Sequence, residues 1–148
     1  MEEKIIYMAY GSNLNLNQMS RLCRNAHIIA KSTLEDYLLL FRGEDGNAFL
    51  NIEEKKGSKV PVLVWEISQE DEKSLDVFEE YPVVYHKEYK EVDVEGQRIK
   101  AMAYVMNDGF PLGRPSDTYY NTIRDGYKTA HYDIKILEEA MKASTNHH

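Results

Sequence analysis

Cysteine and positive charge are scarce in this chain. Cys23 is the one cysteine among 148 residues, which excludes an internal disulfide and makes a reducing cytoplasm the expected location. Cys23 falls on the apolar face of a predicted helix, so we expect a packed thiol and not a nucleophile. The 18 lysines and arginines face 25 aspartates and glutamates, giving a net charge of −7 without any basic cluster. Nucleic acid and anionic membranes are therefore not expected as partners.

Long apolar runs and metal-ligand spacings are missing as well. No run approaches the roughly 20 apolar residues of a membrane helix, and no charged-then-apolar leader opens the chain. His27, His86 and His131 are isolated from one another, so neither a metal site nor another cofactor is expected. The chain has no G-x-S-x-G elbow for a hydrolytic triad, and Gly11-Ser12 lacks the Lys-Ser/Thr of a P-loop.

The length suits one domain with a real core, which we predict over residues 1–146, with His147 and His148 as a possible tag remnant. The apolar periodicity predicts the elements in chain order. We expect a strand at 5–9, a helix from 16 to about 25 and a strand at 27–41. A hairpin of 48–53 with 60–67, joined by K-K-G-S, and a helix from Ser68 that ends before Pro82 follow. The last elements are a hairpin of 87–94 with 98–106 and helices at 116–127 and 133–142.

Regular alternation of strands and helices is missing from this order, so a Rossmann-like fold is not expected. We predict an α+β fold in which a small mixed, mostly antiparallel sheet curls into a β-barrel with flanking helices.

The stretch 4–16, K-I-I-Y-M-A-Y-G-S-N-L-N-L, is the candidate centre of the molecule. An apolar run typical of a buried strand stops at a Gly-Ser-Asn turn. Gly11 permits a backbone shape or close approach that a Cβ would block, while Ser12, Asn13 and Asn15 are good caps for a following helix. Backbone N–H groups gathered there would suit a carboxylate or a developing oxyanion. Such turns also occur in purely structural roles, so the turn alone leaves both interpretations open.

Glu79 and Glu80 can be separated by helical geometry. At about 100° per residue, Leu75 and Phe78 set the buried direction, and Glu79 lies at the edge of that apolar stripe. Glu80 points away from it, into water. A carboxylate at an apolar margin loses solvation, which raises its pKa toward the range useful for proton transfer. Amphipathic edges carry glutamate routinely, so a surface role is the alternative.

Tyrosine is unusually frequent, with eleven residues against four phenylalanines. Tyrosine rings can pack while their hydroxyl groups line a polar cavity, although ordinary core and sheet roles account for most of them. Those near the candidate site are Tyr7, Tyr10, Tyr81, Tyr85, Tyr104 and Tyr119.

Three separated stretches together resemble the γ-glutamylcyclotransferase-like family, which includes the AIG2-like proteins. Y-M-A-Y-G-S-N-L at 7–14 resembles the opening signature of that family. L-D-V-F-E-E-Y-P-V-V-Y at 75–85 resembles its L-D-x-x-E-G segment and the tyrosine that follows. P-S-D-T-Y-Y-N-T-I-R-D-G at 115–126 resembles its P-S-x-x-Y helix start. The order and spacing of the three stretches cover most of the chain.

The resemblance implies a small mixed β-barrel with flanking helices around one cavity. It implies that Glu79 is the catalytic acid/base, and that the substrate-binding residues are Tyr7, Met8, Ala9, Tyr10, Gly11, Ser12, Asn13, Tyr85, Tyr104 and Tyr119. The chain departs from the family pattern in two places: Glu80 stands where glycine is usual, and His86-Lys87 where an arginine commonly follows the tyrosine. These departures leave the substrate open.

The expected activity is cyclisation of a γ-glutamyl amine or peptide to 5-oxoproline with release of the free amine, an intramolecular acyl transfer of the lyase type. A non-catalytic member that binds a small γ-glutamyl ligand, or an enzyme that removes a γ-glutamyl protecting group in a biosynthetic pathway, are the alternatives. The expected partner is a small-molecule γ-glutamyl substrate, and the protein is expected to be a monomer or homodimer.

Overall fold

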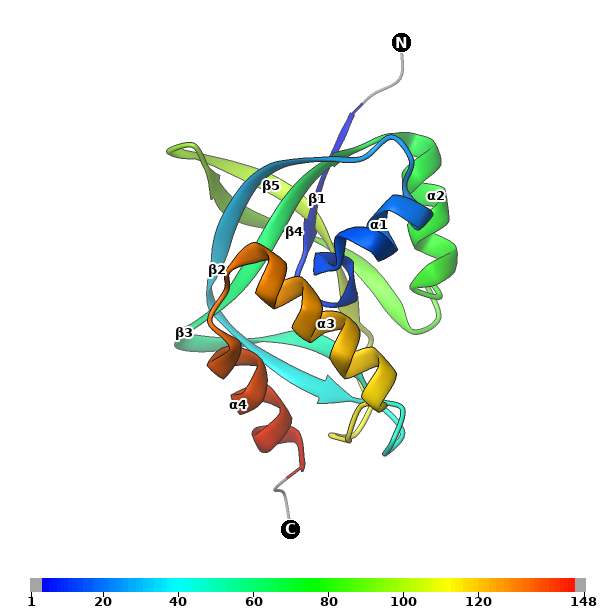
Figure 1. Ribbon diagram of the computed structural model, residues 1–148, viewed down its shortest axis with the longest axis vertical. Coiled ribbons are helices and arrows are strands. Elements are labelled where there is room, and N and C mark those ends of the chain that lie inside the picture. The colour runs from blue at the N-terminus through cyan, green and yellow to red at the C-terminus, as the bar shows by residue number, and fades with distance from the viewer. Residues whose placement is uncertain (1–3, 146–148) are drawn as a thin grey trace.

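A five-stranded sheet with helices against it forms the body of the molecule, seen in Figure 1 as a computed structural model that describes residues 4–145. The strand order is β2-β3-β1-β5-β4. The strands are β1 (Ile5–Ala9), β2 (His27–Arg42), β3 (Phe49–Ile67), β4 (Tyr85–Val94) and β5 (Gln97–Met106). The helices are the short 3-10 turn η1 (Ser12–Leu14), α1 (Leu16–Leu22), α2 (Gln69–Phe78), α3 (Asp117–Ala130) and α4 (Ile134–Thr145).

Strand β1 is the central strand of the sheet. It pairs antiparallel with β3, from Ile5 opposite Ile67 onwards, and parallel with β5, where Tyr7 lies opposite Met102. Its apolar run is buried by this position between two neighbours. The sheet is therefore mixed and mostly antiparallel, as the sequence predicts.

The two edge strands approach each other without closing a hydrogen-bonded barrel. Side chains bridge the gap: the Ser32 hydroxyl of β2 donates to the carbonyl oxygen of Asp93 at 2.7 Å, and the Lys90 ammonium of β4 donates to the Tyr37 hydroxyl at 2.8 Å. The predicted barrel is thus an incomplete one, with side-chain contacts where backbone pairing would close the ring.

The predicted hairpin of 48–53 with 60–67 is wrong. Both segments belong to the single long strand β3, and both pair with β2, where Ile52 lies opposite Leu39 and Val60 opposite Leu34. The polar residues 55–58 form a bulge opposite Asp36, whose carboxylate accepts the N–H of Gly57 at 3.0 Å. Composition cannot distinguish such a bulge from a turn, because both use glycine and polar residues. The bulge interrupts the register of the β2–β3 ribbon, which bends in Figure 1.

Serine side chains cap the starts of α2 and α3. The Ser68 hydroxyl accepts the Asp71 N–H at 3.0 Å, and the Asp71 carboxylate accepts the Ser68 N–H at 3.1 Å, a reciprocal capping box. Ser116 caps α3 by accepting the Tyr119 N–H at 3.1 Å. Helix α1 ends at Leu22, earlier than the predicted end near residue 25, and α2 ends at Phe78, before Pro82 as predicted.

Helix α3 lies directly against η1 because Gly126 has no side chain. A Cβ on Gly126 would come within 2.8 Å of the Leu14 backbone carbon. Helix α4 covers β2 and joins it through Ser144, whose hydroxyl accepts the Phe41 N–H at 2.8 Å. The packing of α3 on η1 therefore brings two distant parts of the chain into direct contact.

Cys23 is buried, and burial raises the pKa of its thiol to about 12. The prediction of a packed thiol is confirmed.

None of the helices within residues 4–145 has the length and apolar character needed to cross a bilayer. The possible tag remnant at 147–148 lies outside the described residues.

Candidate active site

One cavity, of about 310 Å³ with the space toward its open mouth included, gathers residues from across the chain. Ten of the eleven predicted site residues line it, and Ala9 does not, since it is buried within the sheet. Leu50 is an additional lining residue that the sequence analysis did not identify. The lining residues are Tyr7, Met8, Tyr10, Gly11, Ser12, Asn13, Leu50, Glu79, Tyr85, Tyr104 and Tyr119.

The Gly-Ser-Asn turn forms one wall and is held by a small amide network. The Asn13 amide donates to the Tyr7 hydroxyl at 2.9 Å. The Gln18 amide nitrogen lies 2.7 Å from Ser12 Oγ and 2.9 Å from Asn13 Oδ1, and donates to these oxygens. Gln18 had no sequence signal beyond its place in a helix that the turn begins. Because the side chains are held in this way, the turn has a fixed shape.

The Gly-Ser-Asn turn contains the first residues of η1, Ser12 and Asn13. The first turn of a helix leaves N–H groups without intrahelical acceptors. Within residues 4–145, neither the Ser12 nor the Asn13 N–H has a backbone or side-chain acceptor. These two groups can therefore bind an anionic or carbonyl oxygen from outside the protein.

Gly11 plays a different part from the one expected. Its φ of −117° is not left-handed, and a Cβ there would meet the Tyr119 hydroxyl at 3.6 Å and Leu50 Cβ at 3.7 Å, which are ordinary contacts. The expected close approach at Gly11 is therefore wrong. The missing side chain leaves space in the cavity itself.

The peptide group of Leu50 joins two walls of the cavity. Its N–H donates to the Tyr119 hydroxyl at 3.0 Å, and its carbonyl accepts the Tyr85 hydroxyl proton at 2.8 Å. Tyr119 comes from α3 and Tyr85 from β4, so the two tyrosines fasten a helix and a strand to β3. Because Leu50 acts through its backbone, no residue pattern could have predicted this role.

The tyrosine hydroxyl groups differ in what they can still donate. Tyr10 donates to the carbonyl of Tyr104 at 2.6 Å, and Tyr104 donates to the Asp76 carboxylate at 2.6 Å. The hydroxyl groups of Tyr7 and Tyr119 instead accept hydrogen bonds, so their own protons stay available for donation to a ligand. Burial raises the pKa of the Tyr7 and Tyr119 hydroxyls, which therefore stay neutral donors at physiological pH.

Glu79 caps the C-terminal end of α2 and faces the cavity. Its N–H donates to the Leu75 carbonyl at 2.8 Å, and Leu75 is fully buried beneath it. Phe78 is 43% exposed, so the expectation that Phe78 marks the buried side is wrong. Asp71 and Leu75, four residues apart, mark the buried side, and the same spacing continues to Glu79. Glu80 is exposed, as expected, with a left-handed φ of 52°.

The carboxyl group of Glu79 is desolvated, and among residues 4–145 it has no cationic partner. Burial raises its pKa from the usual 4.5 to about 7. Glu79 as a whole residue is partly exposed because it also borders the mouth of the cavity. Neither lysine nor arginine is among the residues that line the cavity. Within residues 4–145, no three His, Cys, Asp or Glu side chains gather as metal ligands would.

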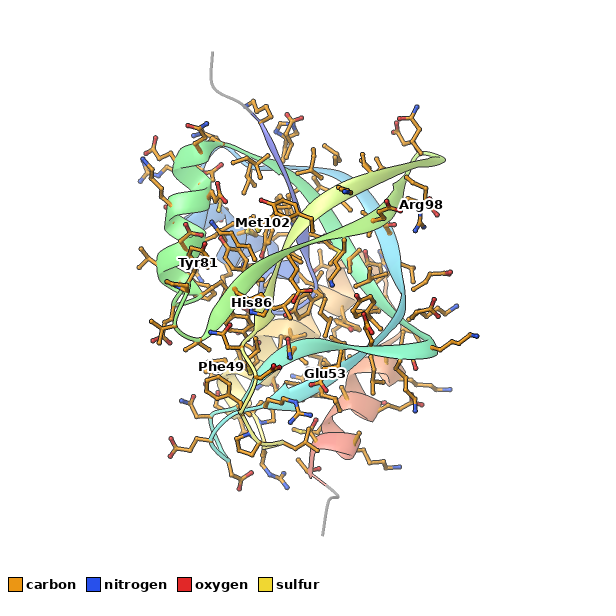
Figure 2. All side chains as sticks on the ribbon, turned by 180° about the vertical axis from the view of Figure 1, so that it is seen from behind. Phe49, Glu53, Tyr81, His86, Arg98 and Met102 are labelled. Carbon is orange, nitrogen blue, oxygen red and sulfur yellow. The ribbon has the colours of Figure 1, made fainter. Side chains whose placement is uncertain are left out.

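Lys87 fastens the end of α2 to strand β4. Its ammonium contacts Glu72 at 2.8 Å and Asp76 at 2.9 Å and lies 4.2 Å from the centre of the Tyr81 ring. Figure 2 shows Tyr81 beside the last turn of α2. Lys87 stands near the position where the resemblance leads one to expect an arginine, and it supports the helix end that carries Glu79. His86 instead contacts Glu88 and Asn107, outside the lining of the cavity.

The cavity adjoins an outer vestibule, a second hollow of about 650 Å³ with its open mouth included, that shares Ser12, Glu79, Tyr85 and Tyr119 with it. The remaining vestibule residues are Gln18, Phe49, Phe78, Glu80 and Val84. Three of these five side chains are apolar, and Glu80 carries the only charge among them. Glu79 therefore sits at the junction between a polar inner cavity and a more apolar outer vestibule.

Comparisons with known proteins identify relatives over most of the chain. The sequence model of a family described as "Gamma-glutamyl cyclotransferase, AIG2-like" matches residues 7–128. A human protein named gamma-glutamylcyclotransferase is 26% identical over 157 aligned residues, covering 98% of this chain and 81% of that protein.

Solved structures share the fold. One titled gamma-glutamyl cyclotransferase superposes with a TM-score of 0.82 at 24% identity, covering 93% of this chain and 86% of that one. YkqA from Bacillus subtilis superposes with a TM-score of 0.79 at 15% identity, covering 94% of this chain and 55% of that one. At these identities the structures establish the fold, which is the mixed sheet with flanking helices described above.

Proposed function

Because the chain belongs to the gamma-glutamyl cyclotransferase, AIG2-like family, we propose that it cyclises a γ-glutamyl compound to 5-oxoproline and releases the free amine. Glu79 is the general acid/base in this proposal. The observation that carries it is one carboxyl group with a pKa of about 7, set without a cationic partner among neutral hydrogen-bond donors. A group with that pKa can both take and return a proton near neutral pH.

The reaction requires no nucleophile from the protein. The α-amine of the γ-glutamyl group reaches its own γ-carbonyl carbon and closes a five-membered ring. Glu79 takes one proton from the α-ammonium, which frees the nitrogen lone pair for attack. Glu79 then gives that proton to the departing nitrogen as the old carbon–nitrogen bond breaks. The second proton lost by the ring nitrogen also ends on the released amine, so the amine leaves as an ammonium ion.

The inner cavity supplies the binding groups. The N–H groups of Ser12 and Asn13 would hold the substrate carboxylate or the oxyanion of the tetrahedral intermediate. The hydroxyl protons of Tyr7 and Tyr119 are available to a second oxygen. A folded γ-glutamyl chain held in this way reacts as a pre-oriented intramolecular pair, and orientation can supply several kcal/mol of the barrier. We further propose that the enzyme acts in a reducing cytoplasm, which suits its single buried thiol.

The test measures 5-oxoproline release from γ-glutamyl-alanine, γ-glutamyl-ε-lysine and glutathione by wild type and by Glu79→Gln. We expect release by wild type and its loss in the variant, because glutamine neither accepts nor donates a proton in this range. Glu95→Gln is the matched control, since Glu95 is an exposed glutamate at the β4–β5 turn. Near-normal turnover in Glu79→Gln would contradict the assigned role.

If wild type releases 5-oxoproline from none of the three compounds but binds one of them saturably, the result would favour a non-catalytic binding protein. Release from a larger γ-glutamyl amine and from none of the three would favour removal of a γ-glutamyl protecting group.

A further inference from the structure

A second groove lies behind the strands that form part of the candidate active site. Leu50 and Tyr85 line the cavity, whereas the next residue of each strand, Asn51 and His86, lines the groove. Successive side chains of a strand point to opposite faces, which explains this division. The groove has a volume of about 920 Å³ with its open side included, and within residues 4–145 it shares no lining residue with the cavity or the outer vestibule. It is therefore a separate candidate site.

The groove is formed where the bent end of the β2–β3 ribbon meets strands β4 and β5. Figure 2 shows Glu53 and His86, which belong to these two parts of the sheet. The lining residues are Arg42, Asn51, Ile52, Glu53, Glu54, His86, Glu88, Val105, Met106, Asn107, Asp108, Gly109 and Phe110.

Both basic side chains of the groove are already bound by carboxylates. The Arg42 guanidinium donates to the two oxygens of Glu53 at 2.5 and 3.1 Å. His86 Nε2 lies 2.6 Å from the Glu88 carboxylate, and His86 Nδ1 lies 2.7 Å from the side-chain oxygen of Asn107. An anionic ligand would have to compete with these carboxylates for either base, so the groove disfavours anions.

Two further carboxylates of the lining, Glu54 and Asp108, are exposed and unpaired. Within residues 4–145, neither of them forms an ion pair. The acids of the groove already favour positive charge: the hydrogen bond to Glu88 and, to a smaller extent, the charge of Asp108 raise the pKa of His86. A ligand that carries a positive charge therefore suits this groove.

Asn51 adds a directional donor to the lining. The residue is 6% exposed, and its side-chain oxygen accepts the Met106 N–H at 2.9 Å, which fixes the orientation of the amide group. Within residues 4–145 the amide nitrogen donates to no protein acceptor, and it is not sealed off from solvent, so it reaches the groove. Buried amide groups normally have a hydrogen-bond partner. An oxygen atom of a ligand would supply one.

The surface between these polar groups is apolar. Ile52, Val105 and Met106 are buried and line the groove, and Phe110 is half-buried beside them. A hydrocarbon chain placed on this surface is stabilised by its removal from water. Apolar walls with a few placed polar groups are typical of small-molecule sites.

We propose that this groove binds a small organic cation whose oxygen acceptor meets the Asn51 amide and whose ammonium meets Glu54 and Asp108, with a short apolar chain between. Amino amides and amino alcohols belong to this chemical class. The site is separate from the proposed cyclisation and does not depend on it.

The test is an NMR titration that follows the backbone amide signals, because such shifts report both the affinity and the location of a ligand. The probes are 5-aminopentanamide, pentylamine and pentanamide, which carry a cation with an acceptor, a cation alone and an acceptor alone. We expect saturable shifts at Asn51, His86 and Asn107. The amino amide should bind at least about threefold more tightly than either other compound, the scale of one exposed ion pair.

Variants separate the two contacts. Glu54→Gln combined with Asp108→Asn should weaken binding of the amino amide about threefold to tenfold and leave pentanamide unchanged, and salt at about 0.5 M should act in the same direction. Asn51→Asp keeps an acceptor for the Met106 N–H and removes the donor, so the amino amide should then bind no more tightly than pentylamine. Glu95→Gln is the control, which should bind all three compounds as wild type does.

The outcomes are distinct from those of the cyclisation assay. Shifts centred on Ser12 and Glu79 would place the probes in the candidate active site and overturn the proposal. Equal affinities for the three compounds, an affinity unchanged in the double variant, or no saturable shift at millimolar concentrations would overturn it as well. Because Glu54 and Asp108 are exposed, their replacement should leave the fold intact, and the test does not rest on Asn51→Asp alone. The titration measures no turnover, so failure of the proposed function would leave its result standing.

Discussion

Replacing Glu79 by glutamine should stabilise the protein, and by an amount that depends on pH. The pKa of this carboxyl group is about 7 in the folded protein against its usual 4.5, because burial removes the charged form from water. A pKa raised by folding means that the protonated form is favoured in the native state. The stability contributed by protonation is complete below about pH 4.5 and is lost as the pH rises through about 7.

The magnitude follows from that difference. Each pKa unit between the folded and unfolded states corresponds to about 1.4 kcal/mol, so ionised Glu79 lowers the free energy of unfolding by about 3 kcal/mol above pH 7. Glutamine has the same shape and does not ionise. We therefore expect Glu79→Gln to match wild type in stability at about pH 4.5 and to be about 3 kcal/mol more stable at about pH 8.5. The difference in the free energy of unfolding should grow steadily between these two pH values.

The assay is urea unfolding of wild type and Glu79→Gln at several pH values, followed by circular dichroism, with Glu95→Gln as the exposed control. The slope of free energy against urea should be the same for all proteins, since the same surface is exposed on unfolding. A gain that is constant with pH would mean that the side chain, and not its charge, is destabilising. No gain at high pH would show that the carboxyl group is well solvated, and the assignment of Glu79 as a base tuned by burial would fail.

The remaining predictions concern activity and backbone geometry. The kcat/KM of wild type should rise with pH around an apparent pKa of about 7, since the base must be ionised; a rise centred at about pH 4.5 would contradict the burial of Glu79. Gly11→Ala should keep the fold yet raise KM or lower kcat at least severalfold, because its Cβ would lie 3.6 Å from the Tyr119 hydroxyl and fill part of the cavity. Glu80→Gly should raise the free energy of unfolding by about 0.5–1 kcal/mol, because glycine relieves the left-handed backbone at a smaller entropic cost. Glu139→Gly, within α4, should instead lower the free energy of unfolding by about 1 kcal/mol. Equal effects of the two glycine substitutions in urea titrations would refute the role given to the left-handed φ of Glu80.

The sequence predicts the parts of this molecule that depend on short patterns. The buried strand, the Gly-Ser-Asn turn and the capping of α2 all follow from neighbouring residues, and Glu79 follows from its spacing to Leu75. The parts that failed depend on partners far along the chain. A long strand with a bulge at 55–58 looks like a hairpin until its pairing with β2 is known, and Leu50 contributes a peptide group that any apolar residue would supply.

Two of the misses have the same physical origin. Phe78 is apolar and lies at helical spacing, so periodicity assigns it to the core, yet it forms part of the vestibule and is half-exposed. Gln18 has the composition of a surface helix residue, yet it holds Ser12 and Asn13. Hydrophobic patterning cannot predict sites where an apolar side chain is kept in contact with solvent, or where a polar one is kept for its neighbours.

The central position of β1 has a consequence for how the protein folds. The β2–β3 and β4–β5 ribbons are each joined by one connection, and both can form from nearby residues. Strand β1 comes first in the chain, yet Ile5 pairs with Ile67 and Tyr7 with Met102, so both its neighbours are distant. Contacts of this kind form late, because a long loop must close before they stabilise anything. In refolding, we expect circular dichroism to recover before the proposed activity does, because we expect the strand that leads into the Gly-Ser-Asn turn to enter the sheet last.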